Sequence, residues 1–269
     1  MDDSARLGNN EMIIRMKYKN IKSISENKGS FLITPHVEKY EGFGEIVKLG
    51  SDIKGFQILD MVVFVEYSSS PWADIVVTTV EKIMKVPKDF DPVEASRKFK
   101  DWYTAYRLLI DFGNHKVLIQ NASESSTGRA VIHLARLLGI ESICIMASKE
   151  NTDCIKSELV QVGATHVYTE EEFQTIEVHT FVKSLKPTFC LDAVGGTMLN
   201  SLCHCLDFNS TVVTYSANST NRISISPFLL ISMNIKLFGF WLPLWINQNN
   251  YKAKIEMILH LEMLWLMNF

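Results

Sequence analysis

The chain has 269 residues, of which 47% are hydrophobic and 21% charged, close to the roughly 45–50% and 25% of an average soluble globular protein. This composition excludes fibrous, low-complexity and disordered proteins. Lys and Arg total 27 against 30 Asp and Glu, so no broad basic face for binding nucleic acid is expected. Glycine is scarce, at 13 residues. The composition favours an enzyme that acts on small molecules.

The first segments in chain order predict a small β-rich region. Residues 11–90 contain short alternating runs, such as Ile46–Leu49 and Met61–Val65, separated by turn residues at 50–52 and 68–71. The following stretch, Glu94–Asp111, has the pattern of a long linking helix. Residues 1–11 are acidic, unlike a mitochondrial transit peptide, so no targeting segment is visible in the chain.

From Val117 onward, short β-branched runs alternate with helical patterns, as in βαβ units. Strands are expected at 117–119, 142–146, 166–168, 189–194, 211–215 and 235–240. Helices are expected at 130–138, 151–162, 169–186 and 197–206, with a capping box at Thr169–Glu172. The pattern predicts an α/β fold with a doubly wound, Rossmann-type parallel sheet. Residues 251–269 are again helical in pattern.

Two features of the sequence raise other possibilities, which the residue pattern disfavours. The apolar stretch 227–246 has Lys236 and Asn234 at its centre and is interrupted by Pro243, which favours a short helix and a buried strand over a membrane span. The five cysteines form no even disulfide framework, and Cys203-His204-Cys205 lacks the spacing of a zinc site. We therefore expect reduced, mainly buried thiols, no metal and no membrane partner.

The segment between the first strand and first helix of the sheet is the candidate phosphate loop. In a dinucleotide-binding fold, this turn brings the backbone close to the pyrophosphate at the helix N-terminus. Here it reads NASESSTG, Asn121–Gly128, and keeps only Gly128 of a GxGxxG pattern. At the end of the second strand, Ser148 and Lys149 favour the 2′-phosphate of NADP over the ribose of NAD, although a lone lysine there is more often a solvated loop residue.

Five segments, in this order, make the chain resemble the mitochondrial trans-2-enoyl-thioester reductases, a family of the zinc-independent medium-chain dehydrogenase/reductase superfamily. They are TAYRLLIDF (Thr104–Phe112), VLIQNASESSTGRAVIHLARLLG (Val117–Gly139), DAVGG (Asp192–Gly196), VVTYS (Val212–Ser216) and KLFGFWLPLW (Lys236–Trp245). The resemblance implies NADPH-dependent reduction of the 2,3-double bond of enoyl thioesters on acyl carrier protein or coenzyme A, in mitochondrial fatty-acid synthesis. A homodimer is one assembly that it leaves open.

The resemblance also implies domains and site residues. It divides the chain into an incomplete GroES-like catalytic domain at 11–93, a Rossmann NADP-binding domain at 94–246 and a truncated C-terminal helix at 247–269. Pyrophosphate, 2′-phosphate and nicotinamide would contact separate groups of residues. The candidate cofactor-binding residues are Ser125, Ser126, Thr127, Gly128, Ser148, Lys149, Tyr215, Ser216, Ala217, Asn218, Phe240, Trp241 and Leu242.

Several positions depart from the family pattern. Phe31 aligns with a tyrosine at the family's reaction centre, so no catalytic residue is assigned. Ser126 stands in place of a glycine, Asp101 in place of an asparagine near the cofactor, and Ala147 in place of a basic residue. Both ends of the chain are shorter than the family pattern. These departures leave two alternatives to an active enoyl reductase: a catalytically impaired paralogue that serves as a binding module, and a quinone-reductase-like relative.

Overall fold

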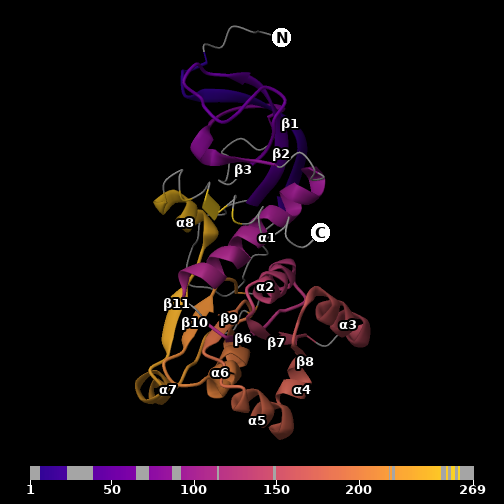
Figure 1. Cartoon of the computed structure of the whole chain (residues 1–269), viewed down its shortest axis with the longest axis vertical. Helices are drawn as coiled ribbons and strands as arrows, with labels where there is room; N and C mark the ends of the chain where they lie inside the picture. Colours follow the sequence, from indigo (N-terminus) through magenta and orange to yellow (C-terminus); the bar gives the residue numbers. More distant parts are fainter. Residues whose placement is uncertain are drawn as a thin grey trace. The chain divides into compact units, whose positions relative to one another are not determined.

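The computed structural model describes residues 7–22, 39–64, 73–86, 92–113, 115–147, 150–217, 219 and 222–249, together with 253, 256, 257 and 260. The chain divides into two compact units, coloured along the sequence in Figure 1. The first comprises Met1–Lys100 and Leu242–Ile258, and the second comprises Asp101–Trp241 and Leu259–Phe269. Each unit has a sheet and a hydrophobic core of its own.

The first unit contains, in its described residues, a five-stranded antiparallel sheet. Its strands are β1 (Glu11–Lys22), β2 (Lys39–Leu49), β3 (Met61–Phe64), β4 (Ile75–Thr79) and β5 (Ile83–Lys85), in the order β4-β1-β2-β3-β5. A 3₁₀ turn, η1 (Val80–Lys82), joins β4 to β5, and a short helix, α8 (Leu242–Gln248), also belongs to this unit. The core is built from Met12, Ile14, Ile46, Val62, Phe64 and Ile83. The β-rich region predicted for 11–90 is thus confirmed, whereas the turn expected at 68–71 lies outside the described residues.

The second unit contains a parallel sheet with six strands in the described part of the chain. The strands are β6 (Val117–Gln120), β7 (Glu141–Met146), β8 (His166–Thr169), β9 (Phe189–Asp192), β10 (Thr211–Thr214) and β11 (Lys236–Gly239), in the order β11-β10-β9-β6-β7-β8. This is the doubly wound order that the sequence pattern predicts. Because β6 and β9 are neighbours while the chain runs from β6 to β7, the order reverses between β6 and β9. Ligands of such sheets bind at that point, outside the carboxyl ends of the strands.

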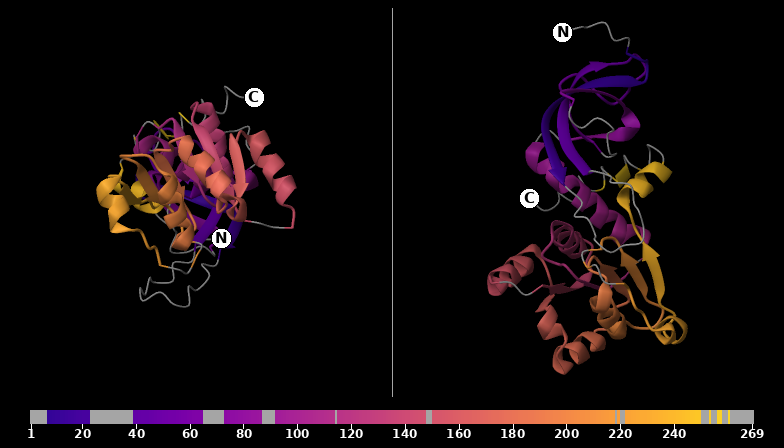
Figure 2. Two further views of the ribbon diagram at one scale, coloured as in Figure 1. Left: turned by 90° about the horizontal axis from the view of Figure 1, so that it is seen from below. Right: turned by 180° about the vertical axis from the view of Figure 1, so that it is seen from behind.

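Helices cover both faces of this sheet, as the two views of Figure 2 show. They are α2 (Ser126–Leu137), α3 (Thr152–Val162), α4 (Glu170–Phe173), α5 (Ile176–Ser184), α6 (Gly196–Cys205) and α7 (Pro227–Ser232), preceded by the long helix α1 (Pro92–Asp111). Strand β7 shows the two faces directly, because successive side chains of a strand point to opposite sides. Ile143 and Ile145 join a cluster with residues of α5 and α6, whereas Cys144 and Met146 join one with residues of α2 and α3.

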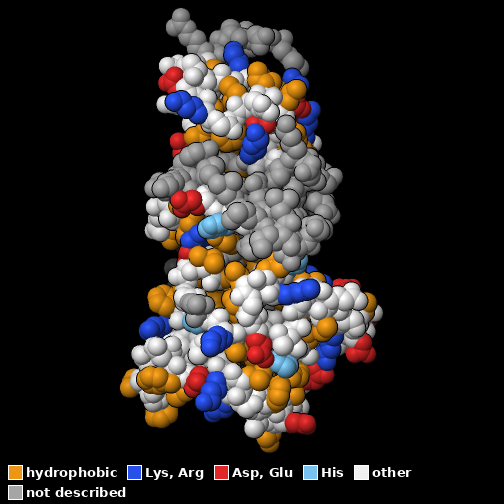
Figure 3. Space-filling view, in the orientation of Figure 1, with side chains coloured by type: hydrophobic (Ala, Val, Ile, Leu, Met, Phe, Trp, Pro, Cys, Tyr) orange, Lys and Arg blue, Asp and Glu red, His pale blue; other side chains and the backbone are white. Residues whose placement is uncertain are grey.

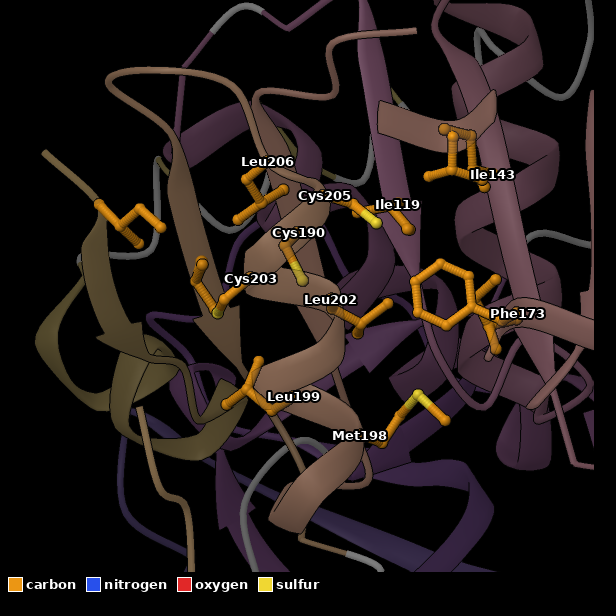
Figure 4. Close-up of a cluster of buried hydrophobic side chains, with 14 of the residues drawn as sticks. Ile119, Ile143, Phe173, Cys190, Met198, Leu199, Leu202, Cys203, Cys205 and Leu206 are labelled. Carbon is orange, nitrogen blue, oxygen red and sulfur yellow. The ribbon is translucent and has the colours of Figure 1, made fainter. Parts of the chain in front are cut away.

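Four of the five cysteines are buried, as predicted, whereas Cys154 is exposed. Three of the buried thiols lie in the core on the α5 and α6 face. Cys190, Cys203 and Cys205 pack there beside Phe173 and Leu202 (Figure 4). Burial raises the pKa of the Cys203 and Cys205 thiols to about 12, so both are protonated at neutral pH. Cys203 and Cys205 therefore belong to the inner face of α6, whereas His204 between them is exposed. No group of three or more His, Cys, Asp or Glu side chains in the described residues is placed to hold a metal ion.

Predicted helix boundaries differ from the structure by one or two residues at α1 and α6, and by more at two other places. The capping box is present, with the Thr169 hydroxyl accepting from the Glu172 amide at 3.1 Å and the Glu172 carboxylate accepting from the Thr169 amide at 2.8 Å. The single helix expected over 169–186 is wrong, however, because Thr175 caps a new helix, α5, after α4 ends at Phe173. Helix α2 begins at Ser126 rather than near 130, since Ser125 is its N-cap.

A strand is present within the expected range 235–240, but the expectation that it is buried is wrong. All four residues of β11 are exposed, because β11 lies at the edge of the described sheet and pairs with β10 alone. The apolar stretch before it forms α7, which is six residues long. Within the described residues, no helix is long and apolar enough to cross a membrane.

Candidate dinucleotide-binding site

The candidate phosphate loop lies at the carboxyl end of β6, where the strand order reverses. Its local structure follows from Ser125, whose hydroxyl accepts a hydrogen bond from the Gly128 amide at 3.0 Å and so caps α2. Ser126 and Thr127 form the first turn, and the Ser126 side chain is exposed. A helix N-terminus with amides pointing outward carries a partial positive charge, which favours an anionic ligand.

Gly128 holds α2 close to the loop that precedes it. A Cβ atom at this position would lie 2.6 Å from the Ala122 carbonyl oxygen and 2.7 Å from the Ser123 carbonyl oxygen. No side chain fits at such distances without moving backbone. The Gln120 side-chain amide donates to the Gly128 carbonyl at 3.1 Å, which ties the same turn back to β6. The one glycine that remains of the GxGxxG pattern is thus the one that the packing of the loop requires.

A buried carboxylate, Asp192 at the end of β9, fixes the loops around this edge of the sheet. One of its oxygens accepts from the Asn121 side-chain amide at 2.7 Å and from the Gly195 amide at 2.9 Å. The other oxygen accepts from the Thr214 hydroxyl at 3.0 Å. Asn121 in turn accepts from the Ala193 amide at 2.7 Å. This network joins the ends of β6, β9 and β10 and is not evident from sequence, although Asn121 and Asp192 both stand directly at strand ends.

Tyr215 follows β10 and is held by its amide, which donates to the Asp192 carbonyl at 2.9 Å. Its hydroxyl is buried and has no hydrogen-bond partner of normal geometry among the described residues. Burial raises the pKa of Tyr215, and the carboxylates of Asp192 and Asp101 raise it further, while the Ser125 hydroxyl has the opposite effect. A buried hydroxyl in this state is suited to a ligand that supplies the missing hydrogen bond.

Asp101 reaches the same helix end from α1. The Thr127 hydroxyl donates to the Asp101 carboxylate at 2.5 Å, so a negative charge lies at the first turn of α2. Arg129, in the same helix, is bound elsewhere. It donates to the Glu124 carbonyl at 3.1 Å and forms an ion pair with Glu158 at 2.9 Å. The contact between Asp101 and Thr127 was not predicted, because the two residues are 26 positions apart.

The other predicted site residues are placed less closely together. Ser216 and Ala217 follow Tyr215 and are exposed. Phe240 follows β11, donates its amide to the Thr214 carbonyl at 3.0 Å and packs edge-on against Phe112. Trp241 is 54% exposed. Leu242 opens α8 in the other unit, and Ser148, Lys149, Asn218 and Phe31 lie outside the described residues.

A dinucleotide requires a turn whose backbone can approach the pyrophosphate closely at a helix N-terminus. The outward N-terminus of α2, the close packing at Gly128 and the buried Tyr215 hydroxyl fit a nicotinamide dinucleotide at this edge. The negative charge of the Asp101 carboxylate would repel the phosphates of the dinucleotide. The site therefore fits the cofactor, with one residue acting against it.

A doubly wound unit with this loop, together with an antiparallel GroES-like unit, defines a medium-chain dehydrogenase/reductase. A family model described as zinc-binding dehydrogenase matches residues 127–260. The chain is 30% identical over 246 residues to the mitochondrial enoyl-[acyl-carrier-protein] reductase of Xenopus tropicalis, covering 89% of this chain and 70% of that protein. The chain belongs to the family of mitochondrial enoyl-[acyl-carrier-protein] reductases. It spans 65–70% of the length of the vertebrate relatives that it matches.

Solved structures support the same fold. The complex of Etr1p with NADP and crotonyl-CoA superposes with a TM-score of 0.81 at 20% identity, over 97% of this chain and 81% of that one. The Etr1p/Etr2p heterodimer of 2-enoyl thioester reductase from Candida tropicalis gives a TM-score of 0.82 at 21% identity, with the same coverage. The predicted fold class, a Rossmann-type sheet with a GroES-like domain, is confirmed by these likenesses.

Proposed function

We propose that this chain reduces the 2,3-double bond of trans-2-enoyl thioesters, with NADPH as the reductant. The observation that carries the proposal is the loop at the end of β6, where Gly128 packs α2 against backbone at a distance that excludes any side chain. That loop belongs to a chain whose relative in Xenopus tropicalis is named for enoyl-[acyl-carrier-protein] reduction. The names of these relatives support a substrate on acyl carrier protein and a mitochondrial location. The solved complex of Etr1p with crotonyl-CoA supports a coenzyme A thioester as an alternative substrate.

When bound, NADPH supplies a hydride. The amides of the first turn of α2, with Ser125, Ser126 and Thr127, would hold the pyrophosphate, and Ser148 and Lys149 the 2′-phosphate. Tyr215, Ser216, Ala217 and Asn218 would line the nicotinamide side, together with Phe240, Trp241 and Leu242. The Asp192 network orders this side by fixing Asn121, Gly195 and Thr214. These assignments remain predictions, and no residue of the chain is assigned as the proton donor.

An assay with crotonyl-coenzyme A tests this function. We expect the purified chain to oxidise NADPH when crotonyl-coenzyme A is present and not when it is omitted, with NADH as the cofactor control. The measurement is loss of NADPH absorbance, with NADPH binding followed separately by fluorescence. Binding without turnover would replace the proposal by the impaired-paralogue hypothesis, and faster turnover of quinones by the quinone-reductase hypothesis. If the chain neither bound NADPH nor turned over crotonyl-coenzyme A, the proposed function would be overturned.

A homodimer is proposed from the exposed edge of the second unit. Strand β11 is exposed along its length, and it presents Leu237 and Phe238. The neighbouring helix α7 exposes Phe228 and Ile231 at 72% and 82%, and hydrophobic side chains gather over α7 at the lower left of Figure 3. An unpaired apolar strand edge of this kind is usually covered, most simply by a second copy in a symmetric contact.

Substitution of one exposed residue on α7 tests the dimer. Ile231→Glu is expected to convert a dimer to a monomer, because it places a charge in the apolar contact without disturbing the core. Ile176→Glu is the matched control, since Ile176 is 87% exposed at the start of α5. Light scattering coupled to size exclusion measures the mass of each protein. A monomeric wild-type chain, or a dimer that survives Ile231→Glu, would contradict the proposed interface.

A further inference from the structure

The carboxylate of Asp101 occupies a position that a cofactor phosphate would be expected to favour. It accepts a hydrogen bond from Thr127, a residue of the first turn of α2, at 2.5 Å. Thr127 is 26 residues away in sequence, so the contact comes from the packing of α1 against α2 and not from a local turn. The partial positive charge of the helix N-terminus is therefore already matched by a side chain of the protein.

In the part of the chain that the structure describes, two further carboxylates act on the same side chain as Asp101. Asp192 is fully buried at the end of β9. The charges of Asp192, Asp101 and Glu124 all raise the pKa of the Tyr215 hydroxyl, in addition to the effect of its burial. Arg129 is directed to Glu124 and Glu158 and not to Asp101. A dinucleotide carrying several negative charges thus meets carboxylates at both the phosphate loop and the Tyr215 side.

We propose that Asp101 limits the affinity of the site for NADPH. Its carboxylate places a negative charge where the pyrophosphate would bind, and it occupies the Thr127 hydroxyl, which is a hydrogen-bond donor of the loop. This inference rests on the proposed function. It assigns to Asp101 an affinity-determining role and requires no contact between Asp101 and the reacting atoms. Because the effect is coulombic, it should be strongest at low ionic strength and weaken as salt screens the charges.

The substitution Asp101→Asn separates charge from shape. Asparagine keeps an oxygen that can accept from Thr127, while the negative charge is lost. We expect NADPH to bind Asp101→Asn roughly tenfold more tightly than wild type at low salt, the order of effect of removing one nearby unit charge. The ratio should fall toward a few-fold at high salt, because the Debye length shortens from about 30 Å to about 3 Å between 0.01 and 1 M.

Fluorescence titration of NADPH into the full chain, at two salt concentrations, measures the ratio of affinities and its dependence on salt. Asp111→Asn is the matched control, because Asp111 lies on the same helix and pairs with Arg107 away from the loop. Asp101→Ser, also uncharged, repeats the test if the asparagine variant does not fold. Equal affinity of wild type and the uncharged variants, or a ratio that does not depend on salt, would overturn the inference and leave the proposed function in place. Absence of NADPH binding in every variant would overturn both.

Discussion

Replacement of Gly128 by alanine is expected to destabilise the second unit and to abolish NADPH binding. The added Cβ would lie 2.6 Å and 2.7 Å from the carbonyl oxygens of Ala122 and Ser123, so α2 or the loop must move. Since both obstacles are backbone atoms, no side-chain rotation relieves the contact. Overpacking of this kind costs typically about 1–3 kcal/mol, and we expect the upper end of that range. Urea-induced unfolding measures the loss of stability, and NADPH fluorescence measures the loss of binding.

A second glycine provides the control for this substitution. At Gly239, in β11, an added Cβ would have no atom of the described residues within 4 Å, apart from the glycine itself and its chain neighbours. Gly239→Ala should therefore change the free energy of unfolding by no more than about 0.5 kcal/mol, as is usual for exposed positions. If Gly128→Ala were as stable as Gly239→Ala and still bound NADPH, the loop could not be the close-packed phosphate site proposed above.

The contrast between these glycines explains what the sequence could predict about the site. Gly128 was identifiable because a strand, a turn and a helix follow one another in order around it, and the structure shows this sequence of elements. The same local reasoning found the capping box at Thr169, because its two partners are three residues apart. Features determined by neighbours in sequence were therefore predictable.

Features determined by distant residues were not. Burial of β11 could not be inferred from its apolar side chains, because exposure follows from its position at the sheet edge. The contact of Asp101 with Thr127 and that of Asn121 with Asp192 join residues 26 and 71 positions apart. Both contacts require the order of the strands and helices to be known before they can be anticipated. The sequence therefore did not predict how the carboxylates of Asp101 and Asp192 are placed around the phosphate loop.

Asp192 illustrates the consequence for stability. Its carboxylate is fully buried and accepts hydrogen bonds from Asn121, Gly195 and Thr214, with the Val194 amide as a further donor at 3.2 Å. Asp192→Leu would leave these donors buried without an acceptor, at about 1–3 kcal/mol for each unsatisfied group before relaxation. Removal of a buried charge offsets part of this loss. We expect a net decrease of about 3 kcal/mol in the free energy of unfolding, measured by urea-induced unfolding.

Asp192→Asn distinguishes the hydrogen bonds from the charge. Its carbonyl oxygen can accept from Asn121 and Gly195, and its amide can donate to the Thr214 hydroxyl, which is able to accept. We expect this variant to lose less than about 1 kcal/mol of stability because each buried group keeps a partner. It should bind NADPH no less tightly than wild type, since it removes one negative charge near the site. A leucine variant as stable as the asparagine variant would show that the strand ends are held by packing, and that the carboxylate does not position the loops.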